Sequence, residues 1–340
     1  MARAADAGGN LHLMRLATFN LESLDLPPKA KVPLELRAEV LRPALERLDA
    51  DILCLQEVNA QRVPGHEHRR LLALEQLLIG TKYERYSRAT TTAGKNHTVA
   101  DVHNLVTLSR FPIRSRCELL HNLVPPPQYC LATAIPPAAD IRPIKFDRPI
   151  LLTEIELPSG SLLAVVNVHL RAPLAATVPG QKLAPFVWKS VGGWAEGYLV
   201  SALRRAAQAL EIRLLLESLL DADRHRLIAV AGDLNAEDHE VPLRIMLGAE
   251  EDTGNAELSA RSLVLLERSL PRDRRWSVLH HGRPQMLDHI AVSCALHRYF
   301  RTIDVHNEAL GDELVGYAKH VRSSYSCHAP VVAEFTDAAR

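Results

Sequence analysis

The sequence predicts a protein of mixed α and β structure, either α/β or α+β, in which helices cover buried β-sheets. Two local patterns and the composition predict this class. Seven short apolar runs of β-type residues recur along the chain, and helical patterns lie between them. Hydrophobic residues make up 47% and charged residues 24% of the 340 residues, as in an ordinary soluble globular protein.

The apolar runs are read as strands. Most are too short and too rich in β-branched residues for helices, and their continuous apolar character indicates burial on both faces. In chain order they are Arg15–Phe19, Asp51–Leu55, Leu105–Leu108, Leu162–Val168, Leu227–Ala231, His289–Val292 and Val331–Phe335.

Three segments between the strands have helical character. Leu34–Leu48 has helical apolar spacing with a kink expected at Pro43, and His68–Leu78 is a second candidate. Val200–Leu220 is the clearest helix, because it is rich in strong helix formers.

Two further segments are predicted to be loops. Thr90–His103 is polar, and Arg171–Tyr198 carries Pro, Gly and several aromatic residues. A long aromatic loop is uncommon inside a compact domain unless it has a function. It either lines a substrate site or is a surface excursion that buries its own aromatic side chains.

Composition excludes several classes of protein. Forty Lys and Arg balance forty Asp and Glu, so any nucleic-acid contact must be a local basic patch. Five cysteines without a CxxC pair argue against disulfides and a structural zinc site, and favour a cytoplasmic location. The sequence shows neither the apolar core of a signal peptide at its start nor a membrane-spanning apolar run.

Polar residues stand next to short apolar stretches at six places in the chain. They are Asn20, Gln56 with Glu57, Asn167 with His169, Asp233 with Asn235, Asp288 with His289, and Cys327 with His328. Singly, each has a simpler explanation: Gly-Asp-x-Asn is a common turn, and a lone histidine is usually a packing residue. Together they predict one site, because ligands bind at strand ends of open sheets.

The chain resembles the endonuclease/exonuclease/phosphatase superfamily, which has the DNase I-like fold. The segments that carry the resemblance, in the expected order, are TFNLES, ADILCLQEV, NLVTLSRFPI, VVNVHLRAP, AVAGDLNAED, MLDHIAVS and SCHAPVV. The resemblance implies an α+β fold, a four-layer α/β/β/α sandwich of two mainly antiparallel sheets flanked by helices. It also implies a single domain over residues 15–336, with residues 1–14 as a flexible extension.

The resemblance further implies hydrolysis of phosphate esters by direct attack of water, with a divalent metal. Such catalysis depends mainly on positioning and on electrostatic stabilisation of the developing charge. Mg²⁺ is the expected cofactor, with Mn²⁺ as a second candidate. A hard cation prefers oxygen ligands, so Glu57 is the expected main ligand and Asn20 assists through its amide oxygen.

The remaining roles are carried over onto matching positions. His328 is expected to be the general base, and Asp288 the carboxylate that fixes its tautomer. Asp233 aligns the attacking water or holds a metal, and Asn235 donates hydrogen bonds to a phosphate oxygen. His169 contacts the phosphate or assists the leaving group. His289, the neighbour of Asp288, is expected to be structural, because adjacent strand residues face opposite ways.

Cys327 stands where the superfamily usually has aspartate. A nucleophilic pair with His328 is disfavoured, because neighbours on a strand face opposite sides. A thiolate ligand would shift the metal preference towards Zn²⁺ or Mn²⁺. The favoured interpretation is a lost metal or water contact that leaves Glu57 as the main ligand. The alternative to an enzyme is a catalytically weak or inactive binding module of the same fold.

The substrate is the least determined feature, because superfamily members attack nucleic acids, nucleotides, phosphoinositides and sphingomyelin with similar catalytic residues. Zero net charge disfavours a non-specific duplex binder. The expected substrate is a small or single-stranded, nucleotide-like phosphodiester, ahead of lipids. Arg171, Trp188, Trp194 and Tyr198 are the candidate substrate-binding residues. No protein partner can be inferred.

Overall fold

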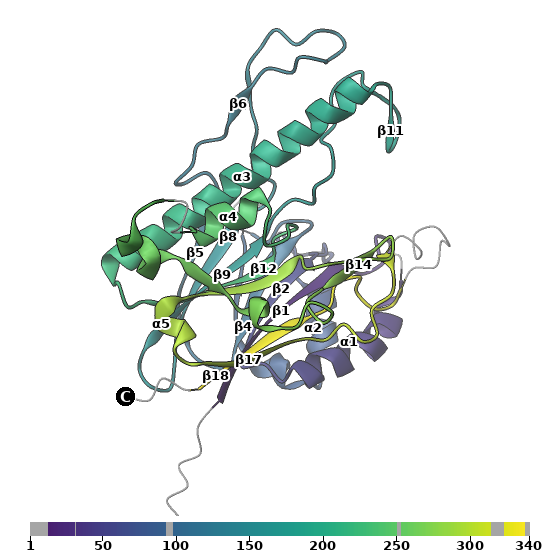
Figure 1. The fold of residues 1–340 in the computed structure, drawn as a ribbon. Coiled ribbons are helices and arrows are strands. Elements are labelled where there is room, and N and C mark those ends of the chain that lie inside the picture. Colours follow the sequence, from purple (N-terminus) through teal and green to yellow (C-terminus); the bar gives the residue numbers. More distant parts are fainter. Residues whose placement is uncertain (1–12, 31, 93–97, 250–252, 314–322, 337–340) are drawn as a thin grey trace, which may run out of the picture.

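Two six-stranded sheets pack face to face in the computed structural model, and helices cover their outer faces (Figure 1). The structure describes residues 13–30, 32–92, 98–249, 253–313 and 323–336. Each sheet contains one parallel pair of strands and is otherwise antiparallel. The predicted α+β four-layer sandwich is therefore confirmed. Most of the expected flexible extension, residues 1–12 of 1–14, lies outside the described residues.

The first sheet has the order β17-β18-β1-β2-β4-β3. Its strands are β1 (Leu13–Leu24), β2 (Ile52–Val58), β3 (Ser87–Thr90), β4 (Asn104–Ser109), β17 (Phe300–Val305) and β18 (Val331–Thr336). Helices α1 (Leu34–Leu48) and α2 (Leu72–Leu78) cover its outer face, where their leucines join one buried cluster with side chains of β1, β2 and β4.

The second sheet has the order β13-β16-β12-β9-β8-β5. Its strands are β5 (Ile113–Leu119), β8 (Ile150–Glu156), β9 (Leu162–His169), β12 (Leu227–Asp233), β13 (Leu263–Leu265) and β16 (Asp288–Ser293). Helices α3 (Val191–Ala222) and α4 (Val241–Leu247) pack on its outer face. A third cluster, with Leu16, Ile52, Val165 and Ile290, fills the space between the sheets.

Shorter elements complete the described chain. They are η1 (Lys82–Arg85), β6 (Gln128–Tyr129), β7 (Arg142–Pro143), β10 (Lys182–Ala184), β11 (Val187–Trp188), η4 (Ala256–Arg261), η5 (Leu266–Ser269), β14 (Val278–His280), β15 (Arg283–Gln285) and α5 (Cys294–His297). No helix in the described ranges combines the length and the apolar character that crossing a membrane requires.

All seven predicted strands are present, and α1 occupies the predicted residues with Pro43 inside it. The second helix begins at Leu72 rather than at His68, and the first strand begins at Leu13. Of the predicted loop Thr90–His103, residues 93–97 lie outside the described residues, and Thr90 ends β3.

The prediction of a loop over Arg171–Tyr198 is wrong for the second half of this range. This part of the chain forms the β10–β11 hairpin and the first two turns of α3, so the helix begins nine residues before Val200. Ser190 caps the helix by accepting the N–H of Gly193. A Cβ atom at position 197 would lie 2.3 Å from the carbonyl oxygen of Ala176. Gly197 therefore allows the helix to pack closely against Ala176, and it does not mark a flexible loop.

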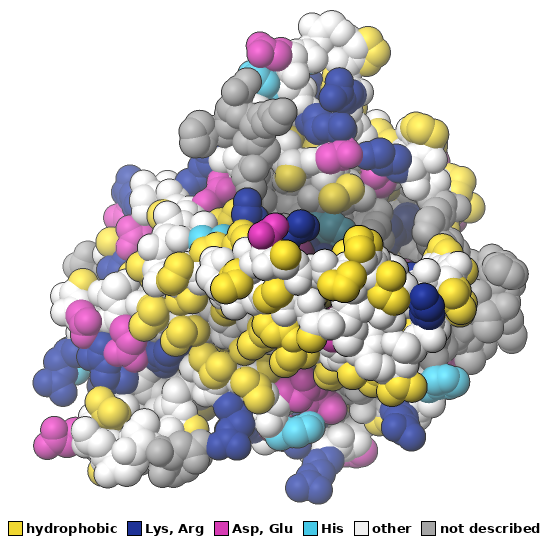
Figure 2. Space-filling view, turned by 90° about the horizontal axis from the view of Figure 1, so that it is seen from above, with side chains coloured by type: hydrophobic (Ala, Val, Ile, Leu, Met, Phe, Trp, Pro, Cys, Tyr) yellow, Lys and Arg dark blue, Asp and Glu magenta, His cyan; other side chains and the backbone are white. Residues whose placement is uncertain are grey.

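The N-terminal part of α3 projects beyond the sandwich together with β6, β7, β10 and β11 (Figure 1). We call these segments, residues 128–143 and 182–200, the arm. Several of its large apolar side chains are exposed, including Phe186 and Val191, which are 84% and 81% exposed. Figure 2 shows the molecule from above, with hydrophobic side chains running across the middle of this face.

Candidate active site

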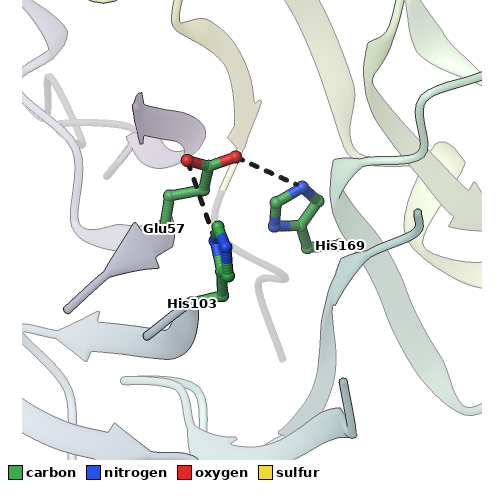
Figure 3. A group of neighbouring side chains, drawn as sticks. All are labelled: Glu57, His103 and His169. Carbon is green, nitrogen blue, oxygen red and sulfur yellow. Dashed lines mark ion pairs between the residues drawn. The ribbon is translucent and has the colours of Figure 1, made fainter. Parts of the chain in front are cut away.

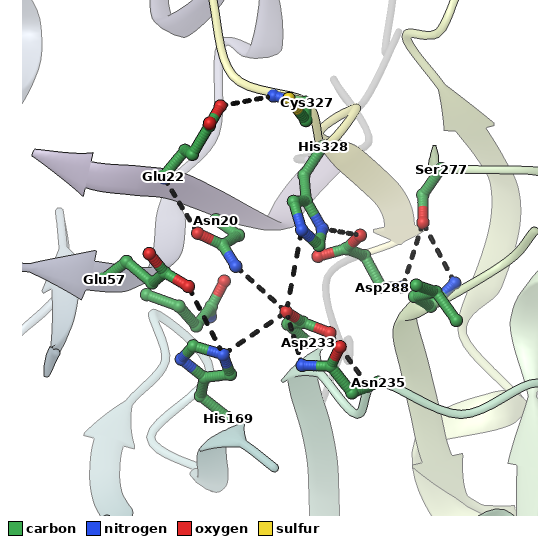
Figure 4. A network of polar contacts seen from close by, with 12 residues as sticks. Asn20, Glu22, Glu57, His169, Asp233, Asn235, Ser277, Asp288, Cys327 and His328 are labelled. Atoms are coloured by element: carbon green, nitrogen blue, oxygen red, sulfur yellow. Dashed lines mark hydrogen bonds and ion pairs between the residues drawn. The ribbon is translucent and has the colours of Figure 1, made fainter. Parts of the chain in front are cut away.

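The ends of four strands bring the predicted site residues together. In the first sheet β1 runs parallel to β2, and in the second β9 runs parallel to β12, so each pair ends at one edge. Asn20 is in register with Gln56, and Asp233 with both His169 and Asp288. Figure 4 shows Asn20 of the first sheet facing His169 and Asp233 of the second.

Asn20 links the two sheets. Its side-chain Nδ2 donates to Oδ2 of Asp233 at 2.9 Å, and its Oδ1 accepts the backbone N–H of Glu22 at 2.9 Å. Both residues of the side-chain bond are fully buried. The amide oxygen that was expected to assist a metal thus already accepts one hydrogen bond, and Asn20 fixes the position of Asp233.

Glu57 stands at the end of β2 in a left-handed backbone conformation, with φ of 58°. Its Oε2 accepts the backbone N–H of Ser23 at 2.9 Å and the Ser23 hydroxyl at 3.1 Å. Burial favours the neutral acid, but Coulombic interactions with His103, Arg148 and His328, together with the Ser23 bond, lower the pKa of Glu57 below its ordinary value. The cleft therefore holds an ionised carboxylate.

Two imidazoles face this carboxylate (Figure 3). Nδ1 of His103 lies 3.8 Å from Oε2 of Glu57, and Nε2 of His169 lies 3.7 Å from Oε1. Burial and the nearby Arg148 lower the pKa of both histidines, that of His169 most strongly. Both rings are therefore neutral near pH 7. Sequence reasoning did not identify His103, which lies in the loop before β4.

His328 and Asp288 form a hydrogen-bonded pair on the other side of the site. Nδ1 of His328 lies 2.8 Å from Oδ2 of Asp288, and Nε2 lies 3.9 Å from Oδ2 of Asp233. Burial opposes charge on His328, but the two carboxylates outweigh it and raise the pKa of the ring. Burial and the charge of Asp288 raise the pKa of Asp233, whereas the charge of His328 acts to lower it.

The Gly-Asp-x-Asn turn after β12 sets Asp233 and Asn235. The backbone N–H of Asn235 donates to Oδ1 of Asp233 at 2.8 Å, and its Nδ2 donates to Oδ2 of Asp233 and to the Leu170 carbonyl, both at 3.0 Å. A side chain at Gly232 would lie 1.9 Å from the Val168 carbonyl oxygen. Both side-chain donors of Asn235 are engaged, so it supports Asp233 directly.

Cys327 contacts a carboxylate that sequence reasoning missed. Its backbone N–H donates to Oε2 of Glu22 at 2.8 Å. Burial and the charge of Glu22 raise the pKa of the Cys327 thiol, which is therefore neutral. Arg37 holds this corner together by donating to the carbonyls of Leu21 at 2.6 Å and Glu22 at 3.0 Å.

A cleft of about 690 Å³ opens onto these groups. Among the described residues, its lining includes Glu22, Glu57, Arg148, His169, Asp233, Asn235, Cys327 and His328. Arg148 lies just before β8, donates to the Leu170 carbonyl at 3.2 Å and was not identified from the sequence. Burial lowers its pKa, against the pull of Glu57 and Asp233. Arg148 places a positive charge near the carboxylates of Glu57 and Asp233.

The expected substrate-binding residues lie apart from this group. Arg171 pairs with Asp147, with Nη1 and Oδ2 at 2.6 Å, one residue before the cleft-lining segment 172–174. Trp188, Trp194 and Tyr198 belong to the arm, where the last two rings stack with centroids 5.6 Å apart. None of these three is among the described residues that line the cleft.

His289 has the structural role expected of it. The ring is fully buried, its Nδ1 bonds the buried Glu267 carboxylate, and its Nε2 donates to the Ala236 carbonyl at 2.8 Å. It is not among the described residues that line the cleft.

Residues 17–330 match the model of the endonuclease/exonuclease/phosphatase family, and the chain belongs to this family. No curated protein matches it. Among solved structures it is similar to an endonuclease/exonuclease/phosphatase from Beutenbergia cavernae, with 18% identity, a TM-score of 0.52, and coverage of 95% of this chain and 71% of that one. It is also similar to truncated TDP2 from Caenorhabditis elegans, with 13% identity, a TM-score of 0.56, and coverage of 95% and 98%. At these identities the similarity shows the fold.

Proposed function

We propose that this protein is a divalent-metal-dependent phosphoesterase, most specifically a phosphodiesterase or nuclease-like hydrolase in which water attacks phosphate directly. The observation that carries the proposal is the arrangement of Glu57, Asp233 and His328 around one cleft, with the Asn20–Asp233 bond joining the two sheets that supply them. Membership of the endonuclease/exonuclease/phosphatase family supports the same class of reaction.

The residues present fit a divalent cation. Glu57 is ionised, and one ligand atom each from Glu57, His103 and His169 lies within 4.8 Å of the others. Glu57 would hold the ion, Mg²⁺ or Mn²⁺. When bound, the ion would polarise a phosphoryl oxygen and offset the charge that builds up on phosphate. Arg148, in the cleft wall, adds a second positive charge for the same purpose.

The attacking water would lie between His328 and Asp233. Because Nδ1 of His328 bonds Asp288, its Nε2 is the atom that faces Asp233, at 3.9 Å. One water can bond both atoms across this gap, so that Asp233 orients it and His328 accepts its proton. The free protein holds His328 as an imidazolium because its pKa is raised, and a bound cation would lower that pKa towards the working range.

His169 and Asn235 contact the same carboxylate oxygen of Asp233 that faces His328. Nε2 of His169 is 3.4 Å from Oδ2 of Asp233 and faces the middle of the site, where the expected contact with phosphate would form. The expected bond from Asn235 to phosphate would require its Nδ2 to exchange the Leu170 carbonyl for a phosphate oxygen. We propose the same cleft for a small or single-stranded, nucleotide-like phosphodiester.

The alternative, a weak or inactive binding module, rests on the missing carboxylate at position 327. Glu22 weakens that alternative, because its carboxylate bonds the backbone N–H of Cys327 and lines the same cleft. An acidic group is therefore present at this corner, supplied by a different residue. The site draws on segments from Asn20 to His328, which supports a single domain over residues 15–336.

Hydrolysis of bis(p-nitrophenyl) phosphate, with Mg²⁺ or Mn²⁺ and with EDTA, tests the proposal. We expect metal-dependent turnover that is lost with EDTA, with Glu57→Gln and with His328→Ala. The control Glu334→Gln changes a carboxylate on β18 that pairs with Arg15, and it should keep full activity. Activity that survives EDTA and His328→Ala would point to a contaminant or to different chemistry. A folded protein without turnover on phosphodiesters and phosphomonoesters, with either metal, would favour the binding module.

A further inference from the structure

We infer that Glu57, His103 and His169 form an imidazole-rich site that prefers a divalent transition metal, such as Mn²⁺, Co²⁺ or Zn²⁺, over Mg²⁺. The inference rests on the proposed function, because it specifies which metal the cleft takes and which residues select it. It adds His103 to the site and makes His169 a metal ligand rather than a phosphate contact.

The distances from Glu57 to the two imidazoles fit ligands that share one ion better than they fit hydrogen bonds. Oε2 of Glu57 lies 3.8 Å from Nδ1 of His103, and Oε1 of Glu57 lies 3.7 Å from Nε2 of His169. Both distances are too long for hydrogen bonds. Two atoms each about 2.1 Å from one ion lie about 3.0 to 4.2 Å apart, depending on the angle between them. Both distances fall inside this range.

The imidazoles have nitrogens without other partners. Nδ1 of His103 and Nδ1 of His169 are buried, and neither has a hydrogen-bond partner among the described residues. His169 is only 3% exposed, so water does not readily satisfy its ring. A buried, unpaired ring nitrogen is unfavourable. For His103 that nitrogen is the one that faces Glu57, and a bound ion would satisfy it.

The backbone holds the three groups in place before any ion binds. Glu57 is the penultimate residue of β2, His169 ends β9, and His103 precedes β4 with φ of 58°, a conformation that is uncommon for residues other than glycine. The His103 N–H donates to the side chain of Asn59 at 2.9 Å, which fixes this conformation. The two rings meet edge to face with centroids 6.1 Å apart. Strain of this kind is expected at functional sites.

The ligand chemistry sets the metal preference. Mg²⁺ binds oxygen ligands and keeps several waters, whereas neutral imidazole suits borderline metals such as Co²⁺ and Zn²⁺. Mn²⁺ is harder than these two ions but accepts imidazole more readily than Mg²⁺ does. Two imidazoles beside one carboxylate therefore select against Mg²⁺.

Metal binding to the full chain, stripped with EDTA, tests the inference without substrate. Calorimetry with Mn²⁺, Co²⁺ or Mg²⁺ alone gives the affinities, and pulsed EPR of the Mn²⁺ protein detects directly bound ¹⁴N. We expect Mn²⁺ and Co²⁺ to bind at least about 10-fold tighter than Mg²⁺, with ¹⁴N coupling from the rings. His103→Gln should weaken Co²⁺ binding about 10- to 100-fold, leave Mg²⁺ binding nearly unchanged and reduce the ¹⁴N signal.

His306→Gln is the matched control, because the Nδ1 of His306 is also buried and unpartnered, but His306 does not belong to the group formed by Glu57, His103 and His169. It should leave metal binding unchanged. Absent ¹⁴N coupling, equal affinity for Mg²⁺ and Co²⁺, or a His103→Gln effect on melting temperature alone would overturn the inference. Hydrolysis supported by Mg²⁺ without ¹⁴N coupling would overturn the metal preference and leave the proposed function standing. Nitrogen-coordinated metal without any hydrolysis would support the metal preference and contradict the proposed function.

Discussion

Nδ1 of His328 and Oδ2 of Asp288 lie 2.8 Å apart, although the two residues are forty positions apart in the chain. Asp288 begins β16 of the second sheet, and His328 precedes β18 of the first, so the bond crosses between the sheets. The Ser277 hydroxyl accepts the Asp288 N–H at 3.0 Å, which fixes the backbone of Asp288. The ring of His328 is thereby fixed with Nε2 facing Asp233.

Asp288→Asn should lower the maximal rate of phosphodiester hydrolysis by about 10²- to 10⁴-fold, because the amide no longer enforces the tautomer. It should also lower the pKa of His328, since the charge of Asp288 is the main factor that raises it. The acidic limb of the kcat/KM profile would then move to lower pH. The measurement is kcat/KM against pH at saturating metal. An unchanged limb would remove His328 as the group that titrates.

Cys327→Asp should tighten Mg²⁺ binding and raise the Mg²⁺-supported rate. The new carboxylate would lie beside Glu22, which bonds the backbone of this residue, and paired carboxylates suit a hard cation. Calorimetry with Mg²⁺ and the hydrolysis assay measure the two effects. Cys327→Ser, which adds no charge, is the control and should behave like the native chain. An unchanged or lower rate in the aspartate variant would mean that the thiol is integral to the site.

Strands at the centre of the sheets could be predicted, and strands at the edges could not. β1, β12 and β9 are buried on both faces and are recognisable as continuous apolar runs. The four edge strands β3, β5, β13 and β17 escaped prediction, as did β8. An edge strand such as β5 has one neighbour and a mostly exposed, polar sequence, so it carries little apolar signal.

The same limit applies to the site. Glu57 and Asp233 follow apolar runs, His328 precedes one, and the order of their segments indicates where they meet. His103 and Arg148 stand in loops before β4 and β8, and only tertiary packing brings them to Glu57. The glycines that begin α3 suggested a loop, because their role in close packing depends on contacts with distant residues such as Gln181 and Ala176.

Glu267→Gln should destabilise the fold by about 3 to 5 kcal/mol near pH 6. The wild-type carboxylate pairs with His289, and both side chains are buried, so the change leaves a buried cation without its partner. Burial opposes charge on His289, but Glu267 outweighs it and raises the pKa of the ring. Denaturant unfolding of both proteins at a series of pH values gives the difference.

This difference should shrink as the pH rises. A raised pKa of His289 means that the folded wild-type protein binds more protons than the unfolded chain. The stabilisation from the pair of His289 and Glu267 is therefore complete below the unfolded pKa of about 6.5. It is lost as the pH passes through the higher pKa of the folded state. Glu334→Gln, which breaks the partly exposed pair with Arg15, should change stability by less than about 1 kcal/mol. A pH-independent difference for Glu267→Gln would exclude a charged His289.

Replacing both Trp194 and Tyr198 with alanine distinguishes a substrate role of the arm from a surface role. The two rings stack and are 45% and 44% exposed, which leaves them available to a base. Stacking on an aromatic ring contributes about 1 to 3 kcal/mol per base, so KM for a single-stranded oligonucleotide should rise about 10-fold or more. Turnover of bis(p-nitrophenyl) phosphate should not change, because neither ring is among the described residues that line the cleft.

Phe186→Ala serves as the control for general apolar adhesion, because Phe186 is the most exposed large apolar side chain of the arm. If stacking is specific, this variant keeps the native KM for the oligonucleotide. An equal rise in both variants would indicate non-specific contact. If KM is unchanged in both, the arm makes no contribution to binding this substrate, and the phosphodiester is recognised within the cleft alone.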